Sequence, residues 1–369
     1  MKTLTLVTLG SGRRPGRDEL ARMEDAGECP RALLFEDVLN SDILSEHYLQ
    51  NAPLIRRALY KLLPPSVAQV LEAFFVKDKY DAVISWGERA SLLFASFLKI
   101  TGTRIPHIAL MYWFTPAKKA VILKRVVSNI DRIITWSQIQ RDIGIDRLHI
   151  PSSKIIHVNY FVDHLFWRPI RVETDMISAV GNEMRDYPTL LKAMKGLDIR
   201  CHIVAGSAKG GTHPTVKAVK DQGPLPPNVT IGRMSYRELR SVYARSRFVV
   251  YPLLMSETNH GITSILEAMA MGRAVICTRT KGHVDVIQDG RTGILVSPGD
   301  PEALRQAIQY LWNRPEEAER MGKEARKQVE QRHTFEQFAN AVRHVVEEVI
   351  ATNGTAKFKT NGVTSLIPI

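Results

Sequence analysis

A carboxylate in the middle of an apolar helix is the residue of this sequence with the clearest chemical potential. A strand is expected to end near Tyr251, and the residues after a polar loop predict a helix over about Thr263–Met271, closed by Gly272. Glu267 lies within that helix beside apolar neighbours. A buried carboxylate must be paired or bound to a ligand, and two ribose hydroxyls would satisfy both of its oxygens. The alternative is that Glu267 only bonds neighbouring backbone or Arg273.

The loop before this helix supplies a second binding element. Backbone N–H groups gather at a helix N-terminus, where an anion or a sugar oxygen is favoured. Gly261 stands in this loop, and a glycine lets the backbone approach a ligand closely. The segment therefore predicts a site for an anionic group or a sugar.

The same segment carries a family resemblance. The run Leu266–Ala270, followed by Gly272 and Val275-Ile276, resembles the retaining GT-B fold glycosyltransferases of family four, the glycosyl transferases group one. Their hallmark is a pair of glutamates in an E-x7-E pattern, the second inside a Leu-Glu-Ala-Met-Ala run. The likeness is good over about residues 130–350 and weak before them. Further similar segments are Trp136-Ser137-Gln138, Val158–Asp163, Val180-Gly181 with Arg185–Leu191, Gly232–Ser235, and Asp289–Val296.

The resemblance implies how a donor nucleotide would be held. Glu267 would bind the ribose hydroxyls, and Arg233 with Met234 would border the base. The expected donor is a nucleoside-diphosphate sugar. The predicted donor-binding residues are Gly10, Gly12, Asn182, Arg233, Met234, Asn259, His260, Gly261, Ile262, Thr263 and Glu267.

Arg185 is the predicted cation for the diphosphate. It stands where the family has a Lys or Arg that stabilises the leaving group, a role suited to a guanidinium. The alternative is a surface arginine that pairs with Asp186. The family's second diphosphate arginine is Asn182 here, which weakens the cationic clamp unless another residue takes its place, and the candidates are Arg13, Arg14 and Lys209.

The first glutamate of the family's pair is displaced in this chain. Asn259 stands eight positions before Glu267, and the nearest carboxylate, Glu257, stands ten before it. Either Glu257 reaches the donor sugar through a bulged loop, or Asn259 replaces the carboxylate with an amide. We expect both near the sugar, with Arg185 and Glu257 as the catalytic residues.

The resemblance also implies retaining transfer of the hexosyltransferase type (EC 2.4) without a metal ion. The sequence contains no D-x-D triplet, the pattern with which the other large glycosyltransferase fold holds a divalent ion. The charge on the leaving group would be offset by Arg185 and by helix-terminal N–H groups. No cofactor is expected beyond the donor substrate.

The N-terminal half offers a candidate acceptor side. Many relatives have a histidine at the end of a strand in this half, whereas the comparable position here is aromatic. Tyr112 and Trp113 are predicted to stack on a sugar or line a lipid channel, and core packing is the alternative. His107, at the start of that strand, is predicted to be structural.

Strand-like runs alternate with amphipathic stretches twice along the chain, which is typical of parallel α/β sheets. We therefore predict an α/β protein of GT-B type, with two Rossmann-like, doubly wound domains facing a central cleft. The predicted parts are an acceptor-side domain (1–168), a nucleotide-sugar domain (169–334), a helix packing back toward the N-domain (335–351) and a flexible tail (352–369). The predicted strands are Thr3–Leu9, Ala82–Trp86, His107–Met111, Arg132–Thr135, Ile155–Val158, Met176–Val180, Ile199–Val204, Val229–Ile231, Phe248–Tyr251, Ala274–Cys277 and Gly293–Val296.

The formal net charge of +12 is concentrated in one block. Residues 51–150 hold 15 Lys and Arg against 7 Asp and Glu, an excess of 8. Within them, Leu54–Leu63 and Lys118–Val127 interleave cations with apolar residues at helical spacing, which suits an anionic membrane surface or a lipid-linked acceptor. The alternative is an ordinary amphipathic helix with a basic, solvated face. Nucleic acid is disfavoured as a partner because the sequence has no nucleic-acid-binding motif.

The cysteines and the apolar stretches indicate in which cellular compartment the protein is expected. Cys29, Cys201 and Cys277 have no metal or disulfide spacing, so a reducing cytoplasm is expected, with peripheral membrane association as an option. No apolar stretch reaches the roughly 20 residues that a spanning helix needs. Besides a transferase, a nucleotide-sugar-binding protein that has lost activity and a sugar-phosphate isomerase or epimerase of the same architecture stay open.

Overall fold

The chain forms two compact α/β units. The computed structural model describes residues 1–7, 14–205, 214–283 and 286–361. Unit 1 contains Met1–Arg17, Leu33–Val158 and the chain from Ala339 onward. Unit 2 contains Asp18–Ala32 and Asn159–Phe338.

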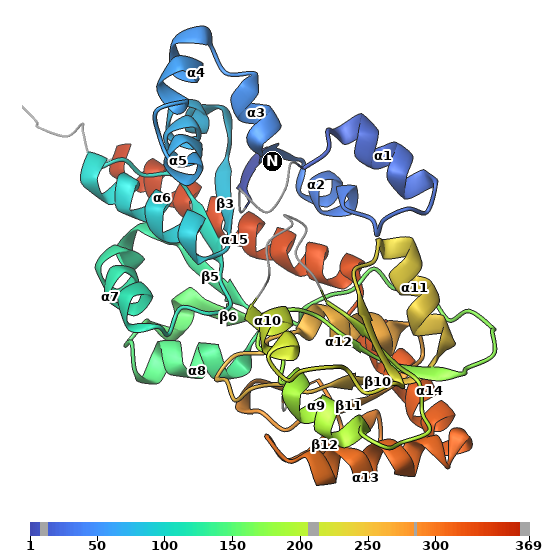
Figure 1. Ribbon diagram of the computed structural model, residues 1–369. Coiled ribbons are helices and arrows are strands. Elements are labelled where there is room, and N and C mark those ends of the chain that lie inside the picture. Colours follow the sequence, from blue (N-terminus) through green and yellow to red (C-terminus); the bar gives the residue numbers. More distant parts are fainter. Residues whose placement is uncertain (8–13, 206–213, 284–285, 362–369) are drawn as a thin grey trace, which may run out of the picture. The chain divides into compact units, whose positions relative to one another are not determined.

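Unit 1 is built on a six-stranded, all-parallel sheet in the order β2-β1-β3-β4-β5-β6. Its inner strands are apolar and buried, as expected when helices cover both faces of a parallel sheet. The strands are β1 (Thr3–Leu6), β2 (Ser41–Leu44), β3 (Ala82–Trp86), β4 (His107–Leu110), β5 (Arg132–Thr135) and β6 (Ile155–His157). The helices are α2 (Leu33–Leu39), α3 (Glu46–Gln50), α4 (Leu54–Tyr60), α5 (Pro65–Val76), α6 (Glu88–Thr101), α7 (Ala117–Val126) and α8 (Gln138–Asp146) (Figure 1).

Unit 2 repeats this plan with a second six-stranded parallel sheet, in the order β12-β11-β10-β7-β8-β9. Its strands are β7 (Met176–Val180), β8 (Cys201–Val204), β9 (Val229–Gly232), β10 (Ser246–Tyr251), β11 (Ala274–Thr278) and β12 (Gly293–Val296). Its helices are α1 (Arg17–Asp25), α9 (Tyr187–Met194), α10 (Pro214–Lys220), α11 (Tyr236–Arg245), α12 (Ile262–Ala270), α13 (Pro301–Trp312) and α14 (Pro315–Arg332), and α15 (Phe335–Asn361) begins here and continues into unit 1.

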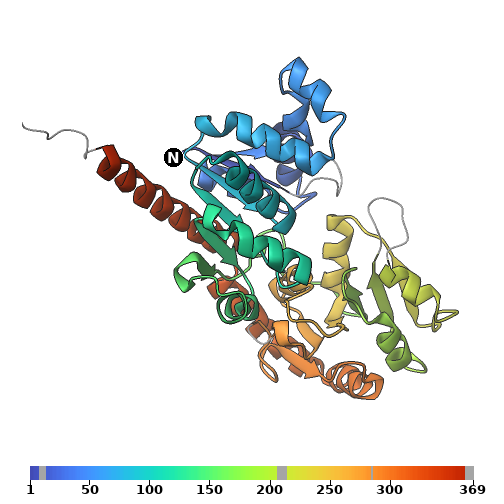
Figure 2. The same cartoon turned by 90° about the vertical axis from the view of Figure 1, so that its left-hand side faces the viewer.

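Two doubly wound parallel sheets confirm the predicted fold class. Every predicted strand has a counterpart in the structure, with differences only at the ends, and residues 8 and 9 of the first lie outside the described part. The sequence prediction missed β2, because only two of the four residues Ser41–Leu44 are apolar and the strand lies at an edge of the sheet. Helix α15 runs past position 351 to Asn361, and Figure 2 shows it unbroken.

Local signals fix the elements around the later site. Ser235 and Glu238 form a reciprocal capping box at the start of α11, and the Asp186 side chain accepts from the Thr189 N–H (3.2 Å) to cap α9. Gly272, at φ +70°, follows the C-terminus of α12, as predicted for a left-handed cap residue. Among the described residues, no helix is both long and apolar enough to cross a membrane.

Candidate functional site

The candidate site lies at the carboxyl edge of the unit 2 sheet. Strands β7 and β10 are parallel neighbours, so the segments that follow Val180 and Tyr251 leave the sheet at the same edge. The second segment leads into α12, which carries Glu267, and α11 lies beside it. Ligands of open α/β sheets bind at this edge.

Glu267 is buried, with 7% of its surface exposed. The Tyr243 hydroxyl, from α11, donates to Glu267 Oε2 at 3.0 Å. The alternative partner considered from the sequence, Arg273, instead donates to the Ala244 carbonyl at 2.7 Å. Among the described residues, no cation pairs with Glu267, so a hydroxyl and not a charge holds this carboxyl group.

Burial raises the pKa of Glu267 from its ordinary value of 4.5 to about 8, an increase that the hydrogen bond from Tyr243 only partly opposes. Folding therefore favours the protonated carboxyl. Between pH 4.5 and about 8 the folded protein retains a proton that the unfolded chain has released, so this group stabilises the ligand-free protein most at low pH, and that contribution is lost as the pH rises to about 8.

We predict that donor affinity rises with pH as Glu267 ionises. Ribose hydroxyls donate to the carboxylate, so binding needs the form that is scarce below pH 8. Affinity should increase by up to about 50-fold from pH 6 to pH 8 and then level off. Titration calorimetry with a nucleoside diphosphate at each pH measures this, and Glu267→Gln, which keeps the titration of the phosphate, serves as the control. Equal profiles for the two proteins would contradict the assignment.

Arg185 is buried (4% exposed) beside the N-terminus of α12. Its Nε donates to the Val180 carbonyl (2.9 Å), its Nη1 to the Glu183 carbonyl (2.9 Å) and its Nη2 to Ser264 Oγ (3.0 Å). The alternative pairing with Asp186 is not the arrangement observed, since the Asp186 side chain caps α9. The guanidinium is thus held in one orientation where the two segments meet.

Two glycines make room for this guanidinium. A Cβ on Gly181 would lie 2.7 Å from Arg185 Cζ, and a Cβ on Gly261 would lie 2.8 Å from it. Both glycines have positive φ, +117° and +83°, which disfavours other residues as well. Gly261 is also the N-cap residue of α12, so a positive side chain and a helix N-terminus lie side by side.

The polar residues of the loop between β10 and α12 differ in burial. Asn259 and His260 are buried, whereas Glu257 is half-buried. The loop is packed from behind by Gly282, where a Cβ would lie 2.7 Å from the Asn259 nitrogen. Ile262 and Thr263 are the first two residues of α12. The Thr263 side chain shares a hydrogen bond with Tyr160, and burial raises the pKa of Tyr160.

Comparison with known proteins shows what this unit is similar to. Residues 177–314 match the family model described as glycosyl transferases group 1. Unit 2 thus resembles the group 1 glycosyltransferases across its sheet. The predicted resemblance is confirmed at this level, and the match begins at β7 and extends into the segment after α13.

Curated proteins similar to parts of this chain are named as transferases of several sugars. The chain is 28% identical over 150 residues to D-rhamnosyltransferase WbpZ of Pseudomonas aeruginosa, covering 37% of this chain and 38% of that protein. It is 28% identical over 153 residues to O-antigen chain mannosyltransferase C of Escherichia coli, covering 41% and 40%. The matched part is thus well under half the length of these relatives.

Solved structures share the fold of the whole chain. Sucrose-phosphate synthase from Thermosynechococcus elongatus has a TM-score of 0.72 at 17% identity, covering 95% of this chain and 100% of that one. Anabaena Alr3699/HepE in complex with UDP has a TM-score of 0.68 at 15% identity, with the same coverage. These similarities confirm the GT-B type of fold.

The other predicted donor-binding residues are more exposed or lie outside the described residues. Arg233 and Met234 follow β9 at the same sheet edge, with Arg233 exposed and Met234 half-buried. Asn182 is half-buried, and its carbonyl accepts from the Thr215 hydroxyl. Gly10 and Gly12 lie outside the described residues, as do the substitute cations Arg13 and Lys209. Arg14, the remaining candidate, pairs with Glu36 within unit 1.

The sequence did not reveal which side chains of unit 2 hold α12 in place. Tyr243 and Tyr251 both donate to the Ser264 carbonyl, and Trp167 packs edge-on against Tyr243 with ring centroids 5.6 Å apart. Arg326, from α14, donates through Nη1 to the Ala270 carbonyl (2.7 Å) at the C-terminal end of α12. These side chains fix the helix that presents Glu267.

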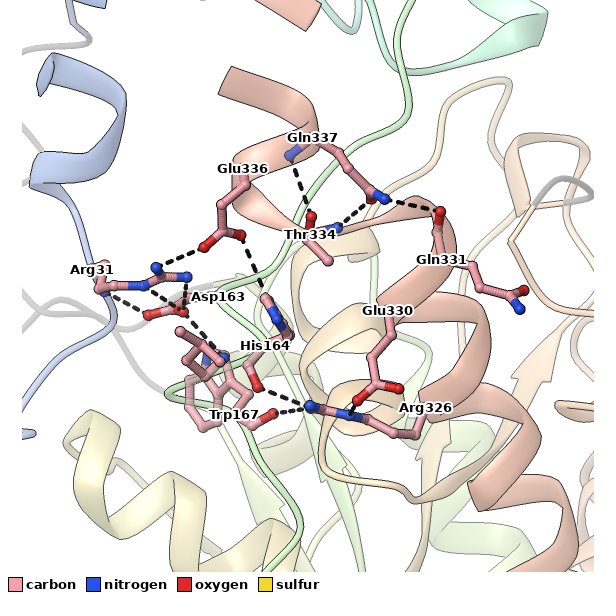
Figure 3. Close-up of polar contacts among 11 residues, drawn as sticks. Arg31, Asp163, His164, Trp167, Arg326, Glu330, Gln331, Thr334, Glu336 and Gln337 are labelled. Carbon is pink, nitrogen blue, oxygen red and sulfur yellow. Dashed lines mark hydrogen bonds and ion pairs between the residues drawn. The ribbon is translucent and has the colours of Figure 1, made fainter. Parts of the chain in front are cut away.

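Arg326 and Arg31 also belong to a set of hydrogen bonds and ion pairs within unit 2 (Figure 3). Arg326 Nη1 also reaches the carbonyls of His164 and Trp167, both at 2.9 Å. Arg31 donates to Asp163 (2.9 Å from Nε to Oδ1) and to Glu336 (2.7 Å from Nη1 to Oε1), which ties the segment Asp18–Ala32 to the rest of unit 2. These contacts connect segments of unit 2. Among the contacts described, none joins Arg31, Asp163, Arg326 or Glu336 to Glu267.

The predicted acceptor residues lie in unit 1, beyond the end of β4. The backbone N–H groups of Tyr112 and Trp113 both donate to Glu88 Oε1, at 2.9 and 2.7 Å. The Tyr112 ring stacks on Trp136, with centroids 5.4 Å apart, and Trp136 in turn lies near Trp86. The strands β3, β4 and β5 therefore present an aromatic cluster of Trp86, Tyr112 and Trp136 at their carboxyl ends, of which the sequence prediction named Tyr112 as an acceptor residue. The ring of Trp113 instead lies under Lys119 Nζ, 4.9 Å from its centroid.

His107 lies at the start of β4 and is fully buried. Its Nε2 lies 2.8 Å from Ser85 Oγ and its Nδ1 lies 3.2 Å from the Asn129 carbonyl. Burial lowers the pKa of His107 to about 4. These contacts agree with its predicted structural role.

Proposed function

We propose that this chain is a retaining, metal-independent glycosyltransferase of the hexosyltransferase type, which moves a sugar from a nucleoside-diphosphate sugar to an acceptor. The observation that carries the proposal is a pair of buried groups at the two sides of one helix start: Glu267 within α12, and the Arg185 guanidinium, from the segment after β7, beside the N-terminus of α12. One group accepts hydrogen bonds and the other is cationic, so together they complement the ribose and the diphosphate of one nucleotide.

The transfer step follows from these roles. The bond between the anomeric carbon and the diphosphate oxygen breaks, and the diphosphate leaves with the electron pair. The acceptor hydroxyl bonds the same face of the sugar, and its proton passes to the leaving diphosphate oxygen. Arg185 and the N–H groups at the start of α12 offset the charge that develops on the diphosphate, a contribution of about 3 to 4 kcal/mol for a well-placed donor. Glu257 and Asn259 are the groups proposed to contact the sugar.

The donor and acceptor are proposed by class. Anabaena HepE has been crystallised with UDP and with UDP-glucose, which favours a uridine nucleotide as the first donor to test. The acceptor is lipid-linked, a glycan or a small molecule, and an anionic membrane surface is a proposed partner. Tyr112 and Trp113 are proposed to face the acceptor.

Metal independence is proposed because positive groups of the chain itself lie beside the expected diphosphate. The Arg185 guanidinium and the N-terminus of α12 would neutralise the diphosphate charge in place of a metal ion. Activity that persists in EDTA would support this part of the proposal, and activity that EDTA abolishes and Mg²⁺ restores would remove it.

A panel of sugar nucleotides tests the function. The protein is incubated with UDP-, GDP-, ADP- and dTDP-sugars and an extract of candidate acceptors, and free nucleoside diphosphate and new glycosides are measured. Release of nucleoside diphosphate with formation of a glycoside, in which the anomeric configuration is kept, is the expected result. Binding without turnover would instead favour a nucleotide-sugar-binding protein that has lost activity, and a rearranged sugar would indicate an isomerase or epimerase.

A further inference from the structure

The segment Leu54–Leu63 of unit 1 turns apolar side chains toward solvent. It comprises α4 and the turn that follows, and Figures 1 and 2 both show it at the outer edge of unit 1. Leu54, Ile55 and Leu62 are 75%, 87% and 83% exposed. A helix of a globular domain normally directs its apolar stripe to the core. In α4 that stripe lies on the solvated side.

The orientation of α4 is fixed by polar contacts on its inner side. The buried Tyr60 hydroxyl donates to Glu72 Oε2 at 2.5 Å, and Arg56 Nη1 lies 3.4 Å from the same oxygen. Arg56 also lies over the ring of Phe75, 5.5 Å from its centroid. The ordinary amphipathic arrangement, with only a basic face in solvent, therefore does not describe this segment.

Helix α7, the other basic segment, provides a contrast. Its Ala120, Leu123 and Val126 side chains are buried, whereas Lys124 and Arg125 are exposed. The ordinary arrangement thus describes most of α7. Val121 and Ile122 of α7 are also exposed, at 50% and 41%, but less than Leu54 and Ile55 of α4.

Cations accompany the exposed stripe. Arg57 and Lys61 are exposed and stand one helical turn apart, and Leu54–Leu63 contains no Asp or Glu. The segment lies in the block of residues 51–150, which has the chain's excess of positive charge. Apolar side chains flanked by cations complement the interface of an anionic bilayer.

A cavity beside α4 has the same character. Its volume is about 570 Å³, and its walls include Leu49, Leu54, Ala58 and Leu63, with Arg57 and Lys61 among the lining residues. Apolar walls beside positive charges match the two parts of a phospholipid, an acyl chain below a phosphate. The cavity and the exposed stripe therefore complement the same ligand.

We infer that Leu54–Leu63 is a membrane-docking segment that lies on an anionic lipid bilayer. Leu54, Ile55 and Leu62 enter the interface, and Arg57 with Lys61 contacts the lipid phosphates. The inference extends the proposed function by assigning its membrane partner to particular residues. Docking does not require sugar transfer, so the two can be tested separately.

Vesicle flotation of the full-length chain tests the apolar part. Vesicles of equal parts phosphatidylcholine and phosphatidylglycerol should bind the protein at low salt, and vesicles of phosphatidylcholine alone should bind it far less. The double variant Ile55→Ser/Leu62→Ser should bind the anionic vesicles roughly 10- to 100-fold more weakly. The matched control is Ile100→Ser, because Ile100 is 82% exposed on α6 of the same unit, and its binding should change less than about twofold.

A second pair of variants tests the charges. Arg57→Ser/Lys61→Ser should weaken binding by roughly 10- to 30-fold at low salt. Lys217→Ser/Lys220→Ser, which removes the same charge from exposed positions on α10 of unit 2, should have a much smaller effect. High salt should weaken binding of the wild-type protein for the same reason.

Three outcomes would overturn the inference. They are no binding of the wild-type protein to anionic vesicles at low salt, unchanged binding of Ile55→Ser/Leu62→Ser, and an equal loss with Ile100→Ser. Circular dichroism melts verify that each variant is folded. Nucleotide binding, measured on the same preparations, should be unchanged in the α4 variants, so failure of docking and failure of the proposed transferase function are distinguishable.

Discussion

Above pH 8, where the carboxylate is ionised, replacing Glu267 with alanine is expected to weaken binding of the donor nucleotide by about 100-fold. Two hydrogen bonds from ribose hydroxyls to a carboxylate contribute roughly 1.5 kcal/mol each, and 1.4 kcal/mol corresponds to a tenfold change in Kd. Glu267→Gln keeps the shape of the side chain and one acceptor oxygen, so its loss should be nearer to tenfold. Titration calorimetry with nucleoside diphosphates measures both values.

The stability of each Glu267 variant is measured together with its nucleotide affinity, so that unfolding is not mistaken for loss of a binding contact. Ligand-free Glu267→Gln should be at least as stable as the wild-type protein above pH 8, because the substitution removes a carboxylate whose ionisation burial opposes. A folded Glu267→Ala protein that binds the nucleotide as tightly as the wild type would eliminate the ribose assignment.

Replacing Arg185 with alanine is expected to lower kcat by about 100- to 1000-fold, the effect of removing one well-placed donor to a developing negative charge. Donor affinity should change much less, since the charge on the leaving group increases as the bond breaks. Arg185→Lys should recover part of the activity because it restores charge without the planar fork. Steady-state kinetics with the best donor from the nucleotide-sugar panel measures the separation of kcat from KM.

The structural contacts of Arg185 need their own control. Its guanidinium bonds Ser264 Oγ at 3.0 Å, so Ser264→Ala removes one of these contacts and leaves the charge in place. Activity should then fall only several-fold, as for one neutral hydrogen bond. If Ser264→Ala and Arg185→Ala were equally impaired, Arg185 would be a positioning residue and not a group that stabilises the diphosphate.

The fold was largely predictable from the sequence because its strands are continuous apolar runs between amphipathic helices. All five residues of Met176–Val180 are buried, and a continuous apolar run of this length is typical of a strand inside a parallel sheet. Strand β2 was missed since Ser41 and Asp42 break the apolar pattern. The sequence left two arrangements of Leu54–Leu63 open, because periodicity identifies the two faces of a helix without telling which one is covered.

The candidate site was predictable only in part. Glu267 and Gly261 stand within a short run that local pattern and resemblance identify. Tyr243 and Arg326, which hold the carboxyl group and the end of α12, come from other helices, so only the tertiary structure brings them to it. The choice between Glu257 and Asn259 depends on the path of a loop, and no periodicity constrains a loop.

The most direct measurement is a thermodynamic cycle between Glu267 and the ribose hydroxyls. The Kd of the best-bound nucleoside diphosphate and of its 2′,3′-dideoxy analogue is determined for the wild-type protein and for Glu267→Gln. The wild type should lose about 30- to 100-fold on removal of the hydroxyls, and the variant should lose less than about 5-fold, because the two groups are coupled. An equal loss in both proteins would show that Glu267 does not contact the ribose and would contradict the site proposed for this chain.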